Sequence, residues 1–175
     1  MAGGVLIANG LHKDGDNGML FEEWGGEHSY LRRRDGCDDV TSQLGCDMSI
    51  LRDFSADPTH VALVHSYEPA DATGQMTPRG VLKLAAFLWA AGPSAFYADV
   101  PPLKGESAHW QCDEWAAMPR FPELAKALGA PTGPGTQAHG VYRRAFASGA
   151  HVSVETRNST ACIVWGDAST SGACA

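Results

Sequence analysis

The sequence has no long hydrophobic run, and lysines and arginines number only 13 against 20 aspartates and glutamates in 175 residues. No stretch approaches the roughly 18 apolar residues of a membrane-spanning helix, so we expect no membrane partner. The formal net charge of -7 argues against a nucleic-acid partner, because phosphate backbones are bound by basic surfaces. The N-terminus also lacks the basic and apolar segments of a signal peptide. The compartment therefore stays open; a longer parent protein with its own signal would be secreted.

Several enzyme motifs are missing as well. The sequence has no G-x-S-x-G elbow, no Walker loop and no G-x-G-x-x-G motif. Its five scattered cysteines form no C-x-x-C pair, which leaves free thiols, or one disulfide with the remainder free, as the two interpretations. His60 and His65 stand five apart on an expected strand and therefore face opposite sides. We expect neither a metal site nor a cofactor.

Three short apolar runs end abruptly in polar side chains. Val5–Ala8 is followed by Asn9, Met19–Phe21 by Glu22, Glu23 and Trp24, and Val61–Val64 by His65, Ser66, Tyr67 and Glu68. Continuous apolar runs of this length are typical of strands buried on both faces of a parallel sheet. Because α/β barrels build their active sites at the carboxyl ends of such strands, these polar positions form the candidate site.

Two helices are expected beside these strands. The first opens near Asp38-Asp39 and has one apolar stripe, formed by Val40, Leu44, Met48 and Leu51. The second has Thr77 as its N-cap and Pro78 in its first position, and it ends at Gly92-Pro93. Since this second helix is apolar nearly all round, it must be covered on more than one side.

The C-terminal part changes character. Residues 98–119 are expected to be irregular, and a short helix is predicted from Pro122 to Leu128. Three short strands separated by turn residues then predict an antiparallel meander, with the ranges Val141–Phe146, Ala150–Glu155 and Thr160–Trp165.

The order of strands and helices, with polar strand ends, suggests part of a (β/α)₈ barrel. Such barrels typically need about 250 residues, and only about three βα units are visible here. The prediction is therefore an α/β fold, the C-terminal part of a (β/α)₈ TIM barrel followed by a small antiparallel β meander. Residues 1–132 would form the partial barrel, and residues 133–175 the antiparallel segment.

The motifs together resemble the C-terminal part of the glycoside-hydrolase-like TIM-barrel families, over most of the 175 residues. The resemblance rests on Glu22-x-Trp24 after a strand and on the segment Tyr142-Arg143-Arg144-Ala145-Phe146-Ala147-Ser148-Gly149. Two features depart from the families: Glu155-Thr156 follows the last alternating valines in place of an Asn-Pro pair, and the first half of the barrel is missing. The resemblance implies a hydrolase acting on a carbohydrate, provided that the missing N-terminal half is supplied.

Glycoside hydrolysis commonly needs two carboxyl groups, about 5–5.5 Å apart for retention and about 6.5–9.5 Å apart for inversion. Glu22 and Glu23 are the catalytic candidates, but successive strand residues face opposite sides, so both cannot serve as the pair. The spacing to Trp24 favours Glu22. Glu68 or Asp71 could supply the second acid, and for each carboxylate the alternative is a solvent-exposed loop position.

Side chains for substrate binding are expected at the same strand ends. Asn9, His65 and Tyr67 supply hydrogen-bond donors and acceptors, although His65 could equally be a core histidine. An apolar platform beneath a sugar ring could come from Trp24, Tyr67, Trp110 and Trp115, unless these rings are core residues. The alternative function is a non-catalytic carbohydrate-binding or degenerate barrel remnant. A half barrel would also leave an open sheet edge, which predicts a homodimer or association through that edge.

Overall fold

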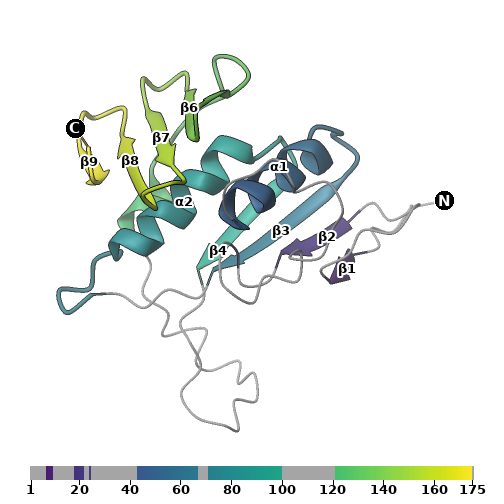
Figure 1. Ribbon diagram of the computed structural model, residues 1–175, viewed down its shortest axis with the longest axis horizontal. Coiled ribbons are helices and arrows are strands. Elements are labelled where there is room, and N and C mark those ends of the chain that lie inside the picture. Colours follow the sequence, from purple (N-terminus) through teal and green to yellow (C-terminus); the bar gives the residue numbers. More distant parts are fainter. Residues whose placement is uncertain are drawn as a thin grey trace, which may run out of the picture.

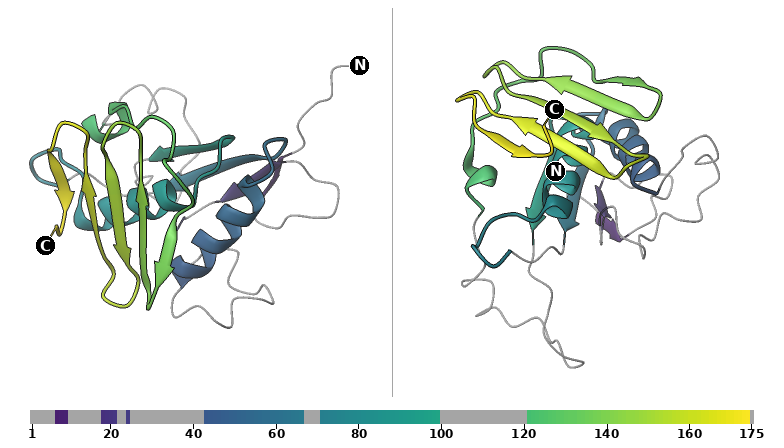
Figure 2. Two further views of the ribbon diagram at one scale, coloured as in Figure 1. Left: turned by 90° about the horizontal axis from the view of Figure 1, so that it is seen from above. Right: turned by 60° about the vertical axis from the view of Figure 1, so that its left-hand side comes forward.

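The computed structural model describes residues 7–9, 18–21, 24, 43–66, 71–99 and 121–174. These residues form three layers: a four-stranded parallel sheet, two α-helices on one of its faces, and a five-stranded antiparallel sheet on the far side of the helices (Figures 1 and 2). A single cluster of buried hydrophobic residues extends through all three layers. The helix layer is therefore the core that both sheets share.

The parallel sheet has its strands in chain order. They are β1 (Ile7–Asn9), β2 (Gly18–Phe21), β3 (Val61–Ser66) and β4 (Ala95–Asp99), and each pairs in parallel with the next. Alternate residues of β3 are buried, namely Ala62, Val64 and Ser66. The strands expected at Val5–Ala8, Met19–Phe21 and Val61–Val64 are therefore present, and β4 is an additional strand that the sequence analysis did not predict.

This architecture contradicts the prediction of a TIM-barrel segment. Three βα units would require a helix after each strand, whereas the described residues contain two α-helices. The sheet is an open row with β1 and β4 at its edges, and the second sheet is antiparallel and separate. Polar residues after apolar strands occur in open parallel sheets as well as in barrels, because both bind ligands at the carboxyl ends of their strands. That pattern alone could not distinguish the two.

The two helices match the predicted apolar patterns. Helix α1 (Gln43–Ser55) buries Leu44, Met48 and Leu51, as its stripe predicts. Helix α2 (Pro78–Ala90) is capped by Thr77, whose side-chain oxygen accepts a hydrogen bond from the backbone N–H of Gly80 at 3.1 Å. Every residue of α2 from position 80 to position 90 is buried. The expectation that this helix is covered on more than one side is therefore confirmed.

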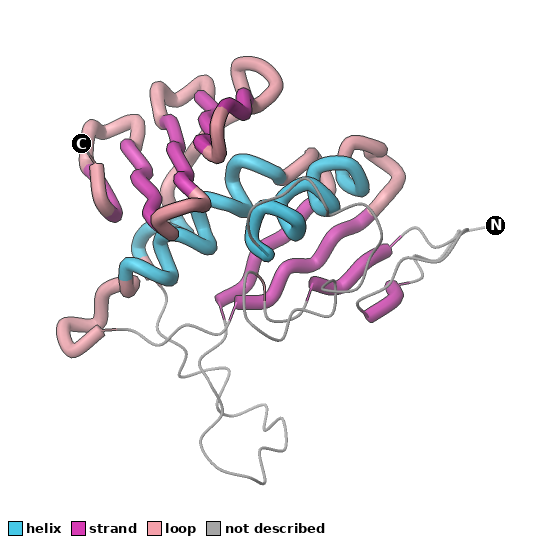
Figure 3. The backbone as a smooth tube through the Cα atoms, in the orientation of Figure 1, coloured by secondary structure: helices cyan, strands magenta, loops and turns pink. Residues whose placement is uncertain are grey.

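The antiparallel sheet provides the second cover of α2. Its strands are β5 (Thr136–Ala138), β6 (Val141–Ala145), β7 (His151–Glu155), β8 (Thr160–Val164) and β9 (Thr170–Gly172), paired in this order (Figure 3). The predicted three-stranded meander corresponds to β6, β7 and β8, and a short strand adds to each side. The helix predicted from residue 122 is a shorter 3₁₀ helix, η2 (Pro122–Ala125).

The segment from Tyr142 to Gly149, on which the family resemblance partly rests, fastens this sheet to α2. The Tyr142 ring meets Trp89 edge-on, with 4.9 Å between ring centroids. The Nη1 of Arg144 donates hydrogen bonds to three carbonyl oxygens at the end of α2, those of Leu88 (3.1 Å), Trp89 (2.9 Å) and Ala91 (2.7 Å). In this chain the motif therefore has a clear structural role, which is to cap α2 and join the two layers.

All three cysteines in the described part of the chain are disulfide-bonded. Cys162 in β8 is bonded to Cys174, and Cys46 in α1 is disulfide-bonded as well. Because Cys46 cannot be paired with Cys162 or Cys174, the chain has more than one disulfide, and both interpretations of the sequence, free thiols and one disulfide with the remainder free, are wrong. Disulfides persist mainly in oxidising environments, which is the environment that a secreted parent protein would meet.

The loop after α2 makes a close contact that only glycine allows. The N–H of Gly92 donates a hydrogen bond to the hydroxyl of Ser55 at 2.9 Å, and that hydroxyl donates to the carbonyl of Leu51 at 2.6 Å. A Cβ at position 92 would overlap the backbone carbonyl oxygen of Ser55. This contact holds the end of α1 against the start of β4.

Replacing Gly92 by alanine is therefore expected to lower the free energy of unfolding by about 2 kcal/mol, because two backbone segments must separate. Urea unfolding followed by circular dichroism measures the change. Gly133→Ala is the matched control, since a Cβ there meets no atom within 4 Å and should change stability by less than about 0.5 kcal/mol. If Gly92→Ala and Gly133→Ala unfold at the same urea concentration, the contact between residue 92 and Ser55 does not require glycine.

Candidate functional site

The carboxyl ends of the parallel strands lie along one edge of the sheet. Phe21 at the end of β2 is in register with Val64, which is in register with Tyr97 of β4. One and two residues later along β3 and β4, His65 pairs with Ala98 and Ser66 with Asp99. This edge therefore receives the residues that follow all three strands, which is where open α/β sheets bind their ligands.

Trp24 fixes the chain just beyond β2. Its side chain is fully buried, and its indole N–H donates a hydrogen bond to the carbonyl of Lys83 in α2 at 3.0 Å. The ring meets Phe21 edge-on at 5.7 Å, and the backbone N–H donates to the carbonyl of His65 at 3.1 Å. Phe21 and Trp24 are thus both anchored at the carboxyl edge. The two residues between them in the sequence are Glu22 and Glu23, which lie outside the described residues.

This position decides the role of the Trp24 ring. The sequence left open whether Trp24 forms a platform for a sugar or belongs to the core. A ring with no exposed surface has no face to offer a ligand, so its contacts make it a core residue.

His65 and Ser66 end β3 at the same edge. His65 is half-buried, and Ser66 is fully buried. The Ser66 hydroxyl has no hydrogen-bond partner in the part of the chain that the structure describes. A buried hydroxyl without a partner is unfavourable by about 1–3 kcal/mol, so this group is well placed to bind a buried water.

The other candidates are only partly described. Asn9 is the last residue of β1, where its backbone pairs with Leu20. Tyr67, Glu68, Trp110 and Trp115 lie outside the described residues. The structure therefore brings Trp24, His65 and the end of β1 to one sheet edge and leaves the predicted roles of the unplaced residues as predictions.

Asp71 has a structural role. Its carboxylate is exposed and accepts hydrogen bonds from the hydroxyl of Thr73 (2.7 Å), the backbone N–H of Thr73 (2.8 Å) and the backbone N–H of Gln75 (2.9 Å). These bonds, led by the one from the Thr73 hydroxyl, lower the pKa of Asp71. The group stays ionised near neutral pH, so it is poorly suited to serve as the proton-donating acid that the sequence analysis considered.

Asp99 is a strand-end carboxylate that the sequence analysis missed. It closes β4 and is in register with Ser66. The available signal was the run Ala95-Phe96-Tyr97-Ala98 after the helix-ending Gly92-Pro93, which is rich in residues that favour strands. The run is short, and only its pairing with β3 makes it a strand.

Within the described ranges, no group of three or more histidines, cysteines, aspartates and glutamates is arranged to hold a metal ion. Among the same residues no helix is long and apolar enough to cross a membrane. No protein-family model matches the chain, and no curated protein matches it. The resemblance to glycoside-hydrolase-like proteins therefore rests on the motifs of the sequence.

Proposed function

We propose that this chain is part of a carbohydrate-active enzyme that hydrolyses O-glycosidic bonds, with Glu22 or Glu23 as acid/base or nucleophile. The observation that carries the proposal is the anchoring of Phe21 and Trp24 at the carboxyl edge of the parallel sheet. Residues packed in the core can support a neighbouring catalytic group, and Phe21 and Trp24 are the described residues that flank the two glutamates in the sequence. The Glu22-x-Trp24 spacing favours Glu22.

Asp99 is the proposed second carboxylate. Strands β2 and β4 are separated only by β3, so their axes lie two strand spacings apart, about 10 Å. Inverting glycosidases use carboxyl groups about 6.5–9.5 Å apart, and this separation of the strand axes is close to that range. Glu68, which follows β3 in the sequence, is the alternative. The ring of the half-buried His65 is the proposed contact to sugar hydroxyl groups.

Amide variants test the assignment. Glu22→Gln and Asp99→Asn are each expected to lower kcat on a responsive p-nitrophenyl glycoside by at least about 100-fold, because an amide cannot exchange the required proton. A panel of such glycosides identifies the substrate, and Glu23→Gln shows which glutamate is used. Asp53→Asn is the control, since Asp53 is exposed on α1 and pairs with Arg52.

The result separates the proposed enzyme from its alternative. Hydrolysis that survives both Glu22→Gln and Glu23→Gln would refute these catalytic assignments. A chain that binds sugars and hydrolyses none of the panel would instead be a non-catalytic carbohydrate-binding or degenerate remnant.

A further inference from the structure

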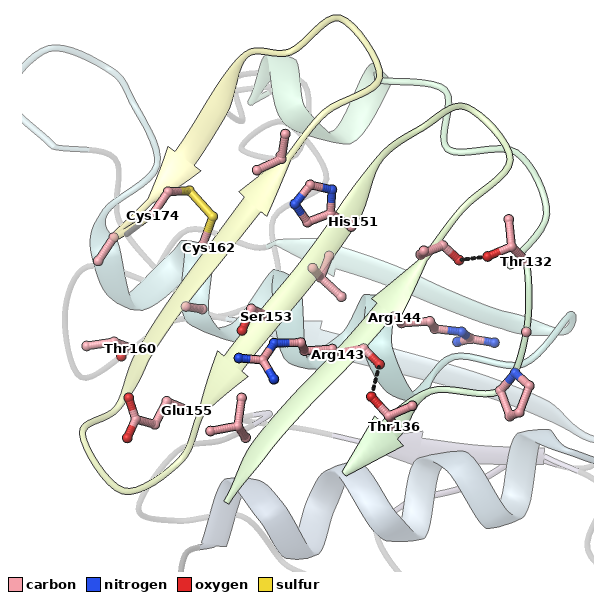
Figure 4. A pocket seen from close by; sticks show the side chains of 18 residues that line it. Thr132, Thr136, Arg143, Arg144, His151, Ser153, Glu155, Thr160, Cys162 and Cys174 are labelled. Carbon is pink, nitrogen blue, oxygen red and sulfur yellow. Dashed lines mark hydrogen bonds between the residues drawn. A yellow bond between two sulfur atoms is a disulfide. The ribbon is translucent and has the colours of Figure 1, made fainter. Parts of the chain in front are cut away.

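The face of the antiparallel sheet turned away from α2 is hollowed. The hollow has a volume of about 690 Å³, within the range of small-molecule sites (Figure 4). Its floor is formed by β6, β7 and β8, which also carry Tyr142, Val154 and Ile163 into the core. The hollow is thus separate from the carboxyl edge of the parallel sheet.

Two walls border this hollow, and both are held to the floor. On one side Thr132 donates from its backbone N–H to the carbonyl of Ala145 at 3.0 Å. On the other side the N–H of Ala173 donates to the carbonyl of Ala161 at 2.8 Å, and the Cys162–Cys174 disulfide ties the last residues to β8 (Figure 4). Walls fixed in this way keep the hollow preformed, which reduces the ordering that binding would require.

The floor presents polar side chains that are not engaged with one another. Arg143, Ser153 and Cys162 form one cross-strand row, and Glu155 and Thr160 form the next. Neighbouring side chains in such rows lie about 4.5–5.5 Å apart, and diagonal ones about 7–8 Å apart. In the described part of the chain, the side chains of Arg143, Ser153 and Glu155 form no hydrogen bond or ion pair within this hollow (Figure 4).

The balance of these groups indicates the ligand. Arg143 supplies donors, Glu155 supplies acceptors, and the hydroxyls of Ser153 and Thr160 supply both. Arg144 also lines the hollow, but its guanidinium is bound to the carbonyl oxygens of α2. The charges left for a ligand are those of Arg143 and Glu155, which cancel, so an uncharged ligand with many hydroxyl groups matches the set better than an anion does. The structure assigns this hollow, by our inference, as a binding site for a neutral oligosaccharide. The choice of a sugar among hydroxylated ligands rests on the proposed function.

Affinity is expected to be modest. No phenylalanine, tyrosine or tryptophan lines the hollow, and the small imidazole of His151 is the one aromatic ring in its lining. Binding then depends on hydrogen bonds that replace those to water, which suggests a dissociation constant of about 1 mM. Such a site would hold a polymeric substrate near the chain rather than carry out chemistry.

Titration of the whole chain with neutral tri- and tetrasaccharides of glucose, mannose and galactose, followed by ¹H–¹⁵N NMR, tests this inference. At least one sugar should shift the amide signals of β6, β7 and β8, and Arg143→Ala and Glu155→Ala should each weaken binding at least fivefold. Arg157→Ala is the control, because Arg157 lies in the turn after β7 and does not line the hollow. Glu22→Gln should leave this binding unchanged, so a failure of the proposed hydrolysis is distinguishable from a failure of the site.

Three outcomes would overturn the inference. The first is that no neutral sugar shifts the amide signals of these strands, even at a concentration 20 times the expected dissociation constant of about 1 mM. The second is stronger binding of matched uronic-acid oligomers, which would indicate an anion site on Arg143. The third is binding that is confined to the carboxyl edge of the parallel sheet and is indifferent to Arg143→Ala.

Discussion

Arg144→Ala is expected to lower the free energy of unfolding by about 3 kcal/mol. Hydrogen bonds from a charged donor contribute about 1.5–3 kcal/mol each, and the variant removes three that converge on the C-terminal end of α2. The three contributions do not add fully, since they share one donor group. The guanidinium of Arg144 is held partly out of water, which lowers the pKa of Arg144. The buried charge therefore depends on these carbonyl oxygens for hydrogen bonds.

Urea unfolding measures the loss, and two variants make it specific. Arg144→Lys keeps a charge but not the planar fork of donors, so it should recover only part of the stability. Arg143→Ala removes the adjacent arginine from the exposed side of the same strand and should cost less than about 0.5 kcal/mol. If the alanine variants at 143 and 144 unfold at the same urea concentration, Arg144 does not fasten the sheet to α2.

The same arginine shows what the sequence could and could not provide. The segment from Tyr142 to Gly149 was noticed as a motif, yet its physical role depends on carbonyls more than 50 residues earlier in the chain. Helix α2 was predictable because its cap and its continuous apolar surface are local signals. The strands β6 to β8 were predictable from alternation and turn residues.

The number and closure of the parallel strands were not predictable in this way. Whether a row of strands closes into a barrel or stays open depends on pairing between distant segments, which periodicity does not record. Strand β4 illustrates the point, because the short run Ala95–Asp99 is identified as a strand only by its pairing with β3. Because β4 was not predicted, Asp99 was not recognised as a carboxylate at the end of a parallel strand, the kind of position that the sequence analysis assigned to Glu22 and Glu23.

The expected homodimer remains a prediction, and the structure indicates where it would form. Strand β4 is an edge of the parallel sheet and carries Phe96, whose side chain is 58% exposed. The run from Ala95 to Ala98 has no lysine or proline, the residues that often protect an edge from pairing. Among the described residues β1 is the other edge of this sheet, and β4, with its exposed Phe96, is the edge along which we expect association.

Trp24 gives the clearest link between stability and the proposed site. Trp24→Ala is expected to lower the free energy of unfolding by about 4 kcal/mol, because it empties a fully buried position in the core. Trp24→Phe keeps an aromatic ring near Phe21 but removes the hydrogen bond to the carbonyl of Lys83. The cost of this smaller change should be about 1–2 kcal/mol, which leaves the chain folded.

The phenylalanine variant then tests the anchor itself. If Trp24 positions the glutamates, kcat on the responsive glycoside should fall at least about tenfold in Trp24→Phe, since small displacements of catalytic groups have large effects on rate. Trp165→Phe is the matched control: its indole also donates one hydrogen bond, to the hydroxyl of Ser171, but from the end of β8 in the other sheet. That control should lose similar stability and keep its kcat. Equal kcat values in the two variants, with both chains folded, would mean that Trp24 is only a core residue and does not position the glutamates.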